Sequence, residues 1–462
     1  MEWRAAWEDP FGQYVWHFRE LIGDRRTWVT FAAVLRGIII SGSLVCKRIA
    51  DHSVVLAKVA KDGGQRVIRL VTGESTRRSQ LSAEDVIEKL CSRGVSQLSQ
   101  SETNDLWLIG DGCDLRKPYA REMPALMKVR DLDGTLVRGY RTINVLGVSP
   151  QRRGILYHRL FSSKEEDFSS ESAEVQKALQ AVGRAVQPLL GRMTVTWILD
   201  RGFDDIAVWR TIWEQQGHLL CRISHDERRV KFIAAHGRWR SGDISQACRT
   251  LQSLALAETE MMVCVGRQKT AKLQSVVAEI KACPLRLTYE SHVRRGVAGE
   301  ELQQPLWLVE IEVRDSSMQP WLLVTDWPVT DEQSALRILR MYRQRWAVED
   351  SFKFIKTCLG WEEVQLLDLE GIRTLVALAW VAAGFLYELG ITLEWPEVQL
   401  LARLGGWEAR KDRPPGKMVL LRGLQRLMDM SVTNTILQDH IAKHGPLSPR
   451  LSALIGLSPP EL

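Results

Sequence analysis

The chain has 462 residues, of which 45% are hydrophobic and 26% charged, enough for two to four domains with buried cores. Its net charge of +6 is compatible with a nucleic-acid partner but is too small to identify one. Eight scattered Cys residues without a C-x-x-C pair argue against a zinc framework or a disulfide scaffold and favour a reducing cytoplasm.

The first region, residues 1–100, is predicted to be mostly helical. Its opening residues lack the basic stretch and apolar run of a signal peptide. Apolar periodicity predicts a helix over residues 30–49, and a good capping residue opens another over 82–90. Polar residues 96–104 predict a linker to the next region.

The second region, residues 101–223, has the pattern of an α/β domain. Apolar runs predict strands at 106–110, 140–148, 155–161, 195–199 and 219–223, and amphipathic segments predict helices at 172–187 and 204–216. Three antiparallel strands followed by helix, strand, helix and strand indicate a mixed central sheet.

A basic, turn-rich stretch, residues 224–320, is predicted to be a β-rich insertion. Its expected strands cover 261–265, 285–289 and 306–313. Residues 321–362 then return to the core, with a strand at 321–325 and one helix over 331–359.

The last region, residues 363–462, is predicted to be helical, with helices at 372–388, 395–404 and 418–430. Its most apolar run, residues 374–386, is too short for a confident membrane span and predicts a buried helix. We therefore expect no membrane partner.

Residues 342–356 carry the most informative pattern. In a single helix, steps of three or four residues place one carboxylate, four cations or hydrogen-bond donors and an indole on one stripe: Tyr342, Arg345, Trp346, Glu349, Lys353 and Lys356. A second, apolar stripe can dock on a core: Met341, Val348, Phe352, Ile355 and Leu359. The pattern suggests that Glu349 holds a metal ion while its neighbours hold phosphates. Taken alone, such a helix is better explained as a solvated face with weak ion pairs.

Two aspartates, Asp111 and Asp200, come directly after apolar strands, where sites form in α/β sheets. With Glu349 they would make three converging carboxylates, which repel one another unless cations neutralise them. Oxygen-only ligands select Mg²⁺ or Mn²⁺, and two such ions can activate a water or a 3′-hydroxyl for attack on a phosphodiester. Taken singly, each Asp is better explained as a turn or cap residue.

Together, the two Asp motifs and the gapless spacing Y-x2-R-x3-E-x6-K resemble the DDE transposases of the bacterial insertion-sequence-four family. The resemblance extends over about residues 106–360. It implies an RNase H-like mixed-sheet core with a β-rich insertion, flanked by N- and C-terminal helical regions. It also implies that Asp111, Asp200 and Glu349 bind two Mg²⁺ or Mn²⁺ ions.

The resemblance assigns further residues to DNA. In that family the motif's Tyr, Arg and Lys hold phosphates of the transposon end, so Tyr342, Arg345 and Lys356 inherit this role, with Trp346 and Lys353 beside them on the stripe. Trp321 matches an indole that stacks on a flipped base in cut-and-paste relatives. A core Trp is the alternative for Trp321, and Trp327 is a rival.

Two less specific matches, Arg222 and His225, and three neighbouring acids that are not assigned to the site remain. Arg222 matches a basic residue beside the acids, and His225 accompanies it. Asp114 competes with Asp111 for the first acid but lies beyond the predicted strand end. Asp204 and Asp205 have the positions of helix-start residues.

The function that the resemblance implies is cut-and-paste DNA transposition. Water cleaves one strand at the transposon end, the 3′-hydroxyl forms a hairpin, water reopens it, and the 3′ ends join target DNA, all without a covalent enzyme intermediate. Residues 1–100 would recognise the terminal inverted repeats in double-stranded DNA, and residues 363–462 would form a homodimer in a paired-end complex. The expected location is the bacterial cytoplasm, near the nucleoid.

Two alternatives remain. An RNase H-like nuclease would cut without joining, and an end-binding regulatory or domesticated relative would not cut. The presence of all three acids argues against the second alternative.

Overall fold

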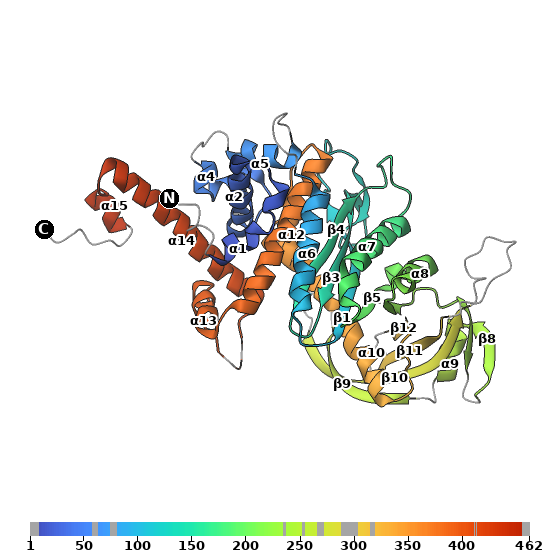
Figure 1. The fold of residues 1–462 in the computed structure, drawn as a ribbon. Coiled ribbons are helices and arrows are strands. Elements are labelled where there is room, and N and C mark those ends of the chain that lie inside the picture. Colours follow the sequence, from blue (N-terminus) through green and yellow to red (C-terminus); the bar gives the residue numbers. More distant parts are fainter. Residues whose placement is uncertain are drawn as a thin grey trace. The chain divides into compact units, whose positions relative to one another are not determined.

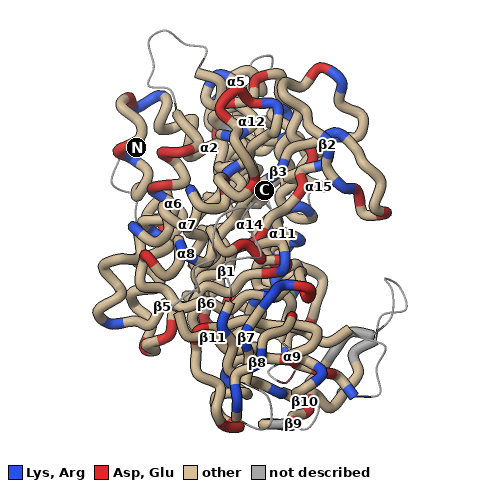
Figure 2. Tube along the Cα trace, turned by 90° about the vertical axis from the view of Figure 1, so that its right-hand side faces the viewer, with Lys and Arg blue, Asp and Glu red and all other residues tan. Residues whose placement is uncertain are grey.

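The computed structural model describes residues 9–57, 63–73, 81–233, 237–251, 255–265, 272–287, 304–314, 319–410, 412 and 414–454. The chain divides into two compact units, shown with the sequence colouring in Figure 1. Unit 1 comprises Met1–Lys89, Tyr119–Pro124 and Lys353–Leu462, and unit 2 comprises Leu90–Pro118 and Ala125–Phe352. Lys and Arg are interspersed with Asp and Glu along the chain (Figure 2). The five-region division stays a prediction.

Unit 1 is helical in its described residues. Its helices are α1 (Pro10–Trp16), α2 (Arg25–Ser41), α3 (Cys46–Asp51), α4 (Val54–Ala57), α5 (Gly63–Thr72), the start of α6 (Ala83–Ser99), the end of α11 (Trp346–Cys358), α12 (Leu369–Thr392), α13 (Trp395–Leu404), α14 (Lys417–His444) and α15 (Pro449–Leu454). The helix predicted over 30–49 is two helices, because Gly42 adopts φ +59° and ends α2. The predicted linker at 96–104 is also too long, since α6 continues to Ser99.

Helix α12 is the one described helix that is long and apolar enough to cross a membrane by length and composition. Most of its side chains are buried, and it packs against α1, α2 and α5. The Tyr14 hydroxyl donates a hydrogen bond to the Val381 carbonyl oxygen at 2.8 Å. These contacts confirm the prediction of a buried helix over residues 374–386.

Unit 2 is built on one mixed sheet. Its strands are β1 (Asp105–Arg116), β2 (Met127–Arg130), β3 (Leu136–Val148), β4 (Arg153–Phe161), β5 (Thr194–Leu199), β6 (His218–Arg222), β7 (Arg229–Ile233), β8 (Trp239–Asp243), β9 (Ala255–Val265), β10 (Lys272–Leu287), β11 (Leu306–Val313) and β12 (Trp321–Thr325). Its helices are α7 (Glu171–Val186), α8 (Ile206–Glu214), α9 (Ile244–Leu251) and α10 (Glu332–Arg343), together with the end of α6 and the start of α11.

The core of this sheet has the strand order β4-β3-β1-β5-β6. Strands β1, β3 and β4 form an antiparallel meander, while β5 and β6 run parallel to β1. Helix α7 connects the meander to β5, and α8 connects β5 to β6. The predicted α/β fold class is confirmed.

The insertion strands continue the same sheet. Strand β12 pairs antiparallel with β6, and β11, β10, β7 and β8 follow in order, with β9 paired to β10. The predicted strands at 306–313 and 321–325 match β11 and β12. Strands β2, β7 and β8 were not predicted, because they are short and contain charged residues instead of an apolar run.

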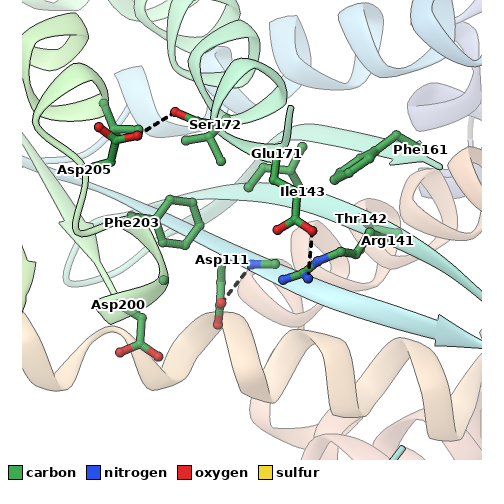
Figure 3. A pocket seen from close by; sticks show the side chains of 14 residues that line it. Asp111, Arg141, Thr142, Ile143, Phe161, Glu171, Ser172, Asp200, Phe203 and Asp205 are labelled. Carbon is green, nitrogen blue, oxygen red and sulfur yellow. Dashed lines mark hydrogen bonds and ion pairs between the residues drawn. The ribbon is translucent and has the colours of Figure 1, made fainter. Parts of the chain in front are cut away.

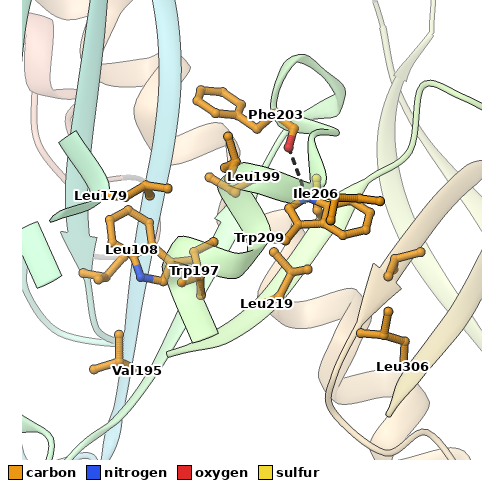
Figure 4. Packing of buried hydrophobic residues seen from close by; sticks show 14 of the residues in the cluster. Leu108, Leu179, Val195, Trp197, Leu199, Phe203, Ile206, Trp209, Leu219 and Leu306 are labelled. Carbon is orange, nitrogen blue, oxygen red and sulfur yellow. Dashed lines mark hydrogen bonds between the residues drawn. The ribbon is translucent and has the colours of Figure 1, made fainter. Parts of the chain in front are cut away.

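Strands β1, β5 and β6 are buried on both faces. Leu108, Trp197 and Leu219 pair in one row and are at most 1% exposed. The next row, which includes Ile109 and Ile198, points to the opposite face and is also buried. Figure 4 shows the first row packed with residues of α7 and α8. Burial on both faces explains why the sequence of these strands is continuously apolar.

Candidate active site

The site begins where the parallel part of the sheet ends. Gly110 and Leu199 form the last residue pair between β1 and β5, so Asp111 and Asp200 follow at neighbouring positions (Figure 3). Asp200 caps a short 3₁₀ turn, and its Oδ1 accepts a hydrogen bond from Arg201 N at 2.8 Å. The Asp111 Oδ1 accepts one from Gly112 N at 2.8 Å.

The sequence suggested that β1 ends before Asp111, but the strand runs past this residue. It continues to Arg116, paired only with β3, and Asp111 lies opposite Asn144. The parallel neighbour β5 is what ends at this level. Asp114 contacts β2 instead, since its Oδ2 accepts a hydrogen bond from Arg130 N at 3.1 Å. Three residues apart on a strand, Asp111 and Asp114 point to opposite faces.

The third acid is carried by α11, just after a break in the helical segment. The prediction of one helix over 331–359 is wrong, because α10 ends at Arg343 and α11 begins at Trp346. At the break, Arg345 N donates to the Tyr342 carbonyl oxygen at 3.0 Å, an i to i+3 bond typical of a tighter 3₁₀ turn. The apolar stripe predicted for this segment is confirmed, since all five of its residues are buried: Met341, Val348, Phe352, Ile355 and Leu359.

Arg345 lies against all three acids. Its Nη1 is 3.7 Å from Asp111 Oδ2 and 3.7 Å from Asp200 Oδ2, and its Nη2 is 2.7 Å from Glu349 Oε1. Arg345 is only 7% exposed, and its Nε and Nη1 atoms are buried without a hydrogen-bond partner. Asp111, Asp200 and Glu349 therefore all contact the same guanidinium.

The electrostatics of the cluster follow from burial and like charge. Burial raises the pKa of Asp111 to about 7; Arg345 opposes this rise, and Asp200 and Glu349 add to it. For Arg345, burial acts to lower the pKa, but the neighbouring Asp200 and Glu349 outweigh it and the net direction is upward. The side chain of Glu349 is 47% exposed, so this acid has room to move.

The donor set fits a hard divalent cation. Three carboxylates offer only oxygen ligands, which Mg²⁺ and Mn²⁺ prefer. Asp111, Asp200 and Glu349 are the residues that would hold such an ion. At their present spacing, the described part of the chain contains no cluster of three acidic, His or Cys side chains ready to ligate a metal. The Arg345 guanidinium is the cation that the cluster contacts.

An aromatic group adjoins the acids. The Trp321 ring lies 5.4 Å from both the Tyr342 and the Trp346 rings, measured between centroids. Trp321 is 6% exposed and Trp346 is 44% exposed. The Tyr342 hydroxyl is buried without a hydrogen-bond partner, and burial, then the charge of Asp200, raises the pKa of Tyr342. Trp346 is thus the indole of this group most accessible to a ligand.

The remaining predicted DNA contacts lie on several elements. Arg222 ends β6 and pairs with Leu323 of β12. Lys353 and Lys356 belong to unit 1, where Lys353 is exposed and the Lys356 Nζ is 3.5 Å from Glu362 Oε1.

Two neighbouring candidates have structural contacts instead. Trp327 donates a hydrogen bond from its Nε1 to Thr196 Oγ1 at 3.2 Å and stacks on His218. His225 lies 3.3 Å from Glu227 and also donates its backbone N–H to Asp204 Oδ2 at 3.1 Å.

Sequence reasoning missed a buried ion pair behind the site. Arg228 Nη2 lies 2.6 Å from Asp204 Oδ1, and both side chains are 1% exposed. Asp204 also accepts a hydrogen bond from Ser224 N at 2.8 Å. Asp204 is therefore not a helix-start residue, whereas Asp205 caps α8 as predicted. The pair joins the turn after Asp200 to the start of the insertion, and a partner 24 residues away leaves no local sequence signal.

A pocket of about 190 Å³ opens beside the two aspartates (Figure 3). Its lining includes Arg141, which lies 2.9 Å from Glu171, and Phe203 from the turn after Asp200. Asp111 and Asp200 both line this pocket.

Comparison with known proteins gives two findings. Residues 125–383, more than half of the chain, match the family model described as the transposase DDE domain. This range contains Asp200 and Glu349 and begins after Asp111. Among solved structures, the chain is similar to a piggyBac transposase synaptic complex with hairpin DNA, with a TM-score of 0.42 and 10% identity over 99% of this chain and 85% of that chain.

Proposed function

Because the chain belongs to the transposase DDE domain family, we propose that it is a DNA transposase that excises an insertion element and joins its 3′ ends to target DNA. The observation that carries the proposal is the convergence of Asp111, Asp200 and Glu349 on one point at the carboxyl end of the parallel strands. These acids supply the oxygen donors for one or two Mg²⁺ or Mn²⁺ ions. When bound, such ions polarise the scissile phosphate and lower the pKa of an attacking water or 3′-hydroxyl.

The protein's own groups then position the DNA. Each step is an in-line displacement at phosphorus, so the protein needs no nucleophilic side chain. The Tyr342 hydroxyl is buried, which supports a role other than nucleophile for this residue. Lys356 and Arg345 offer cations for phosphate oxygens, Arg345 through a planar fork that matches a phosphate.

A hairpin intermediate is the finer part of the proposal. It requires a base to leave the duplex and stack on an aromatic ring. Trp346 is 44% exposed, which supports stacking of the base on this ring. Trp321 is buried against Trp346 and would hold that ring in place. Arg222 would lie beside the displaced strand.

The partners follow from the same family relationship. Residues 1–100 would bind the terminal inverted repeats of the element, and residues 363–462 would join two subunits in a paired-end homodimer. A bacterial insertion sequence of the insertion-sequence-four type, active in the cytoplasm near the nucleoid, is the source that the Y-x2-R-x3-E-x6-K spacing supports.

The decisive experiment is cleavage of a labelled duplex that carries the element's own end, with Mg²⁺. We expect nicking at the end by the wild type and a loss of about a hundredfold or more in Glu349→Gln, while the variant still binds the duplex. The exposed neighbour Asp350, changed to Asn, is the matched control and should cut normally.

The products separate the alternatives. Hairpins and strand-transfer products support the cut-and-paste route, whereas cutting without joining favours a nuclease. End binding without cutting by the wild type favours a regulatory relative. Equal cutting by wild type and Glu349→Gln contradicts the assignment of the acids.

A further inference from the structure

The position of Arg345 has a consequence beyond phosphate contact. Its guanidinium is within 3.7 Å of a carboxylate oxygen of each of the three acids, and it is almost completely buried. Two of its nitrogen atoms, Nε and Nη1, have no hydrogen-bond partner, although burial makes unpaired donors costly. Hydrogen bonding alone therefore does not explain why this side chain lies there.

We propose that Arg345 is the internal counter-ion of the metal-free site, which holds Asp111, Asp200 and Glu349 together and must withdraw before metal ions bind. This inference rests on the proposed function, because it assumes that the three acids are metal ligands. It adds a second role for Arg345, as a competitor of the metal.

The charges explain why such a residue is needed. Three carboxylates brought together in a partly buried site repel one another and would push the strand ends and α11 apart. One guanidinium offsets part of this repulsion, which keeps the acids at their positions. It cannot offset all of it, because three carboxyl groups face one guanidinium, so the cluster still attracts divalent cations.

The geometry explains why Arg345 can leave. Its backbone lies in the 3₁₀ turn between α10 and α11, not within either helix, and such turns in a helical segment often mark hinges. Only the contact with Glu349, at 2.7 Å, is short; the two contacts with the aspartates are at 3.7 Å. A DNA phosphate offers the guanidinium a bidentate partner outside the acid cluster.

Arg345 therefore links the binding of the DNA phosphate to the binding of the metal ion. A phosphate that draws Arg345 away frees the acids for metal, and metal that enters the cluster frees Arg345 for phosphate. Such a linkage is reciprocal, so DNA raises metal affinity by the same factor by which metal raises DNA affinity.

The test is Mn²⁺ binding to the full, DNA-free protein by isothermal titration calorimetry. Removal of the competing charge in Arg345→Gln should tighten Mn²⁺ binding by about fivefold or more. Arg343→Gln is the matched control, because Arg343 is an exposed cation two residues away and should bind Mn²⁺ as the wild type does. Equal or weaker binding by Arg345→Gln, or no binding by either protein, overturns the inference.

Two further readouts keep the test valid if the variant is less stable. In EDTA, Arg345→Gln should melt below the wild type, and saturating Mn²⁺ should raise its melting temperature by more than it raises that of the wild type. Arg345→Lys keeps the charge, so its Mn²⁺ affinity should stay close to wild type. If Arg345→Lys bound Mn²⁺ as tightly as Arg345→Gln does, the charge argument would be overturned.

These outcomes are separable from those of the cleavage assay. If wild type cuts DNA and Glu349→Gln does not, but Arg345→Gln leaves Mn²⁺ affinity unchanged, the counter-ion role is wrong and the transposase function stands. If Arg345→Gln tightens Mn²⁺ binding but the wild type does not cut DNA, the counter-ion role stands and the proposed function is wrong.

Discussion

Asp204 and Arg228 form the most completely buried ion pair near the acids. Their side chains are 1% exposed, and Arg228 also lies over the Trp209 ring at 5.0 Å. Removal of one partner of such a pair leaves an uncompensated buried charge. The pair fixes the turn that follows Asp200, so its loss reaches the site as well as the fold.

We therefore predict that Asp204→Asn lowers the free energy of unfolding by about 3–5 kcal/mol. Asp205→Asn, at the cap of α8, should cost much less, because Asn is also a good helix cap. Urea unfolding of both variants and of Arg228→Met measures the difference. A double variant no worse than either single one confirms that the two residues act as a pair, and additive losses contradict it.

His158 is a second buried polar residue behind the site. Its Nδ1 lies 2.7 Å from Asn144 Oδ1, and Asn144 faces Asp111 across the sheet. Burial lowers the pKa of His158 to about 3, from an ordinary value of 6.5. The folded protein therefore resists protonation at this ring, while the unfolded chain accepts a proton below pH 6.5.

Stability should accordingly be full above pH 6.5 and decrease as the pH falls from 6.5 toward 3. The His158 contribution to this loss is about 2 kcal/mol at pH 5. The measurement is the urea midpoint between pH 7.5 and 5, for wild type and His158→Gln. A variant with the same pH dependence as wild type would show that His158 is not the cause.

At the scale of elements, α13 and α14 of unit 1 meet through glycines. A Cβ at Gly423 would lie 1.9 Å from the Leu401 carbonyl oxygen, so these helix backbones approach too closely for a side chain. By contrast, a Cβ at Gly416, the residue before α14, would meet nothing within 4 Å.

Gly423→Ala should thus lower the free energy of unfolding by about 1–3 kcal/mol through overpacking. Gly416→Ala is the control and should be close to neutral. Thermal unfolding followed by far-ultraviolet circular dichroism compares the two. Equal melting temperatures would mean that the helices separate without cost.

The same scale shows where the sequence was informative. The apolar runs in the sequence predicted the positions of Asp111 and Asp200, because each run ends where the site begins. These runs are apolar because the strands are buried on both faces. The break at Arg345 could not be predicted, since no Pro or Gly interrupts that segment. The pair of Asp204 with Arg228 was missed because the sheet, not the local sequence, brings the two residues together.

At the scale of the molecule, the insertion and the core of unit 2 share one sheet and one hydrophobic cluster. Leu308 of β11 and Leu219 of β6 both belong to the cluster and are fully buried. A shared core implies that the two parts lose structure together instead of as separate domains.

We predict that Leu308→Ala costs about 2–5 kcal/mol and accelerates amide hydrogen exchange in β6 as well as in β11. Hydrogen exchange followed by mass spectrometry, with the exposed Leu132 changed to Ala as control, checks this. Faster exchange confined to the insertion strands would contradict a shared cooperative unit.

Strand β1 lies between β3 and β5 and also carries Asp111, yet the stretch that matches the family begins only at residue 125. A gene fragment trimmed to that stretch would lose the central strand, and β3 and β5 would each present an unpaired edge prone to aggregation. The same twelve residues, 105–116, therefore supply both the first acid of the site and the central strand of the fold. A fragment that keeps both the first acid and the central strand must therefore begin at or before residue 105.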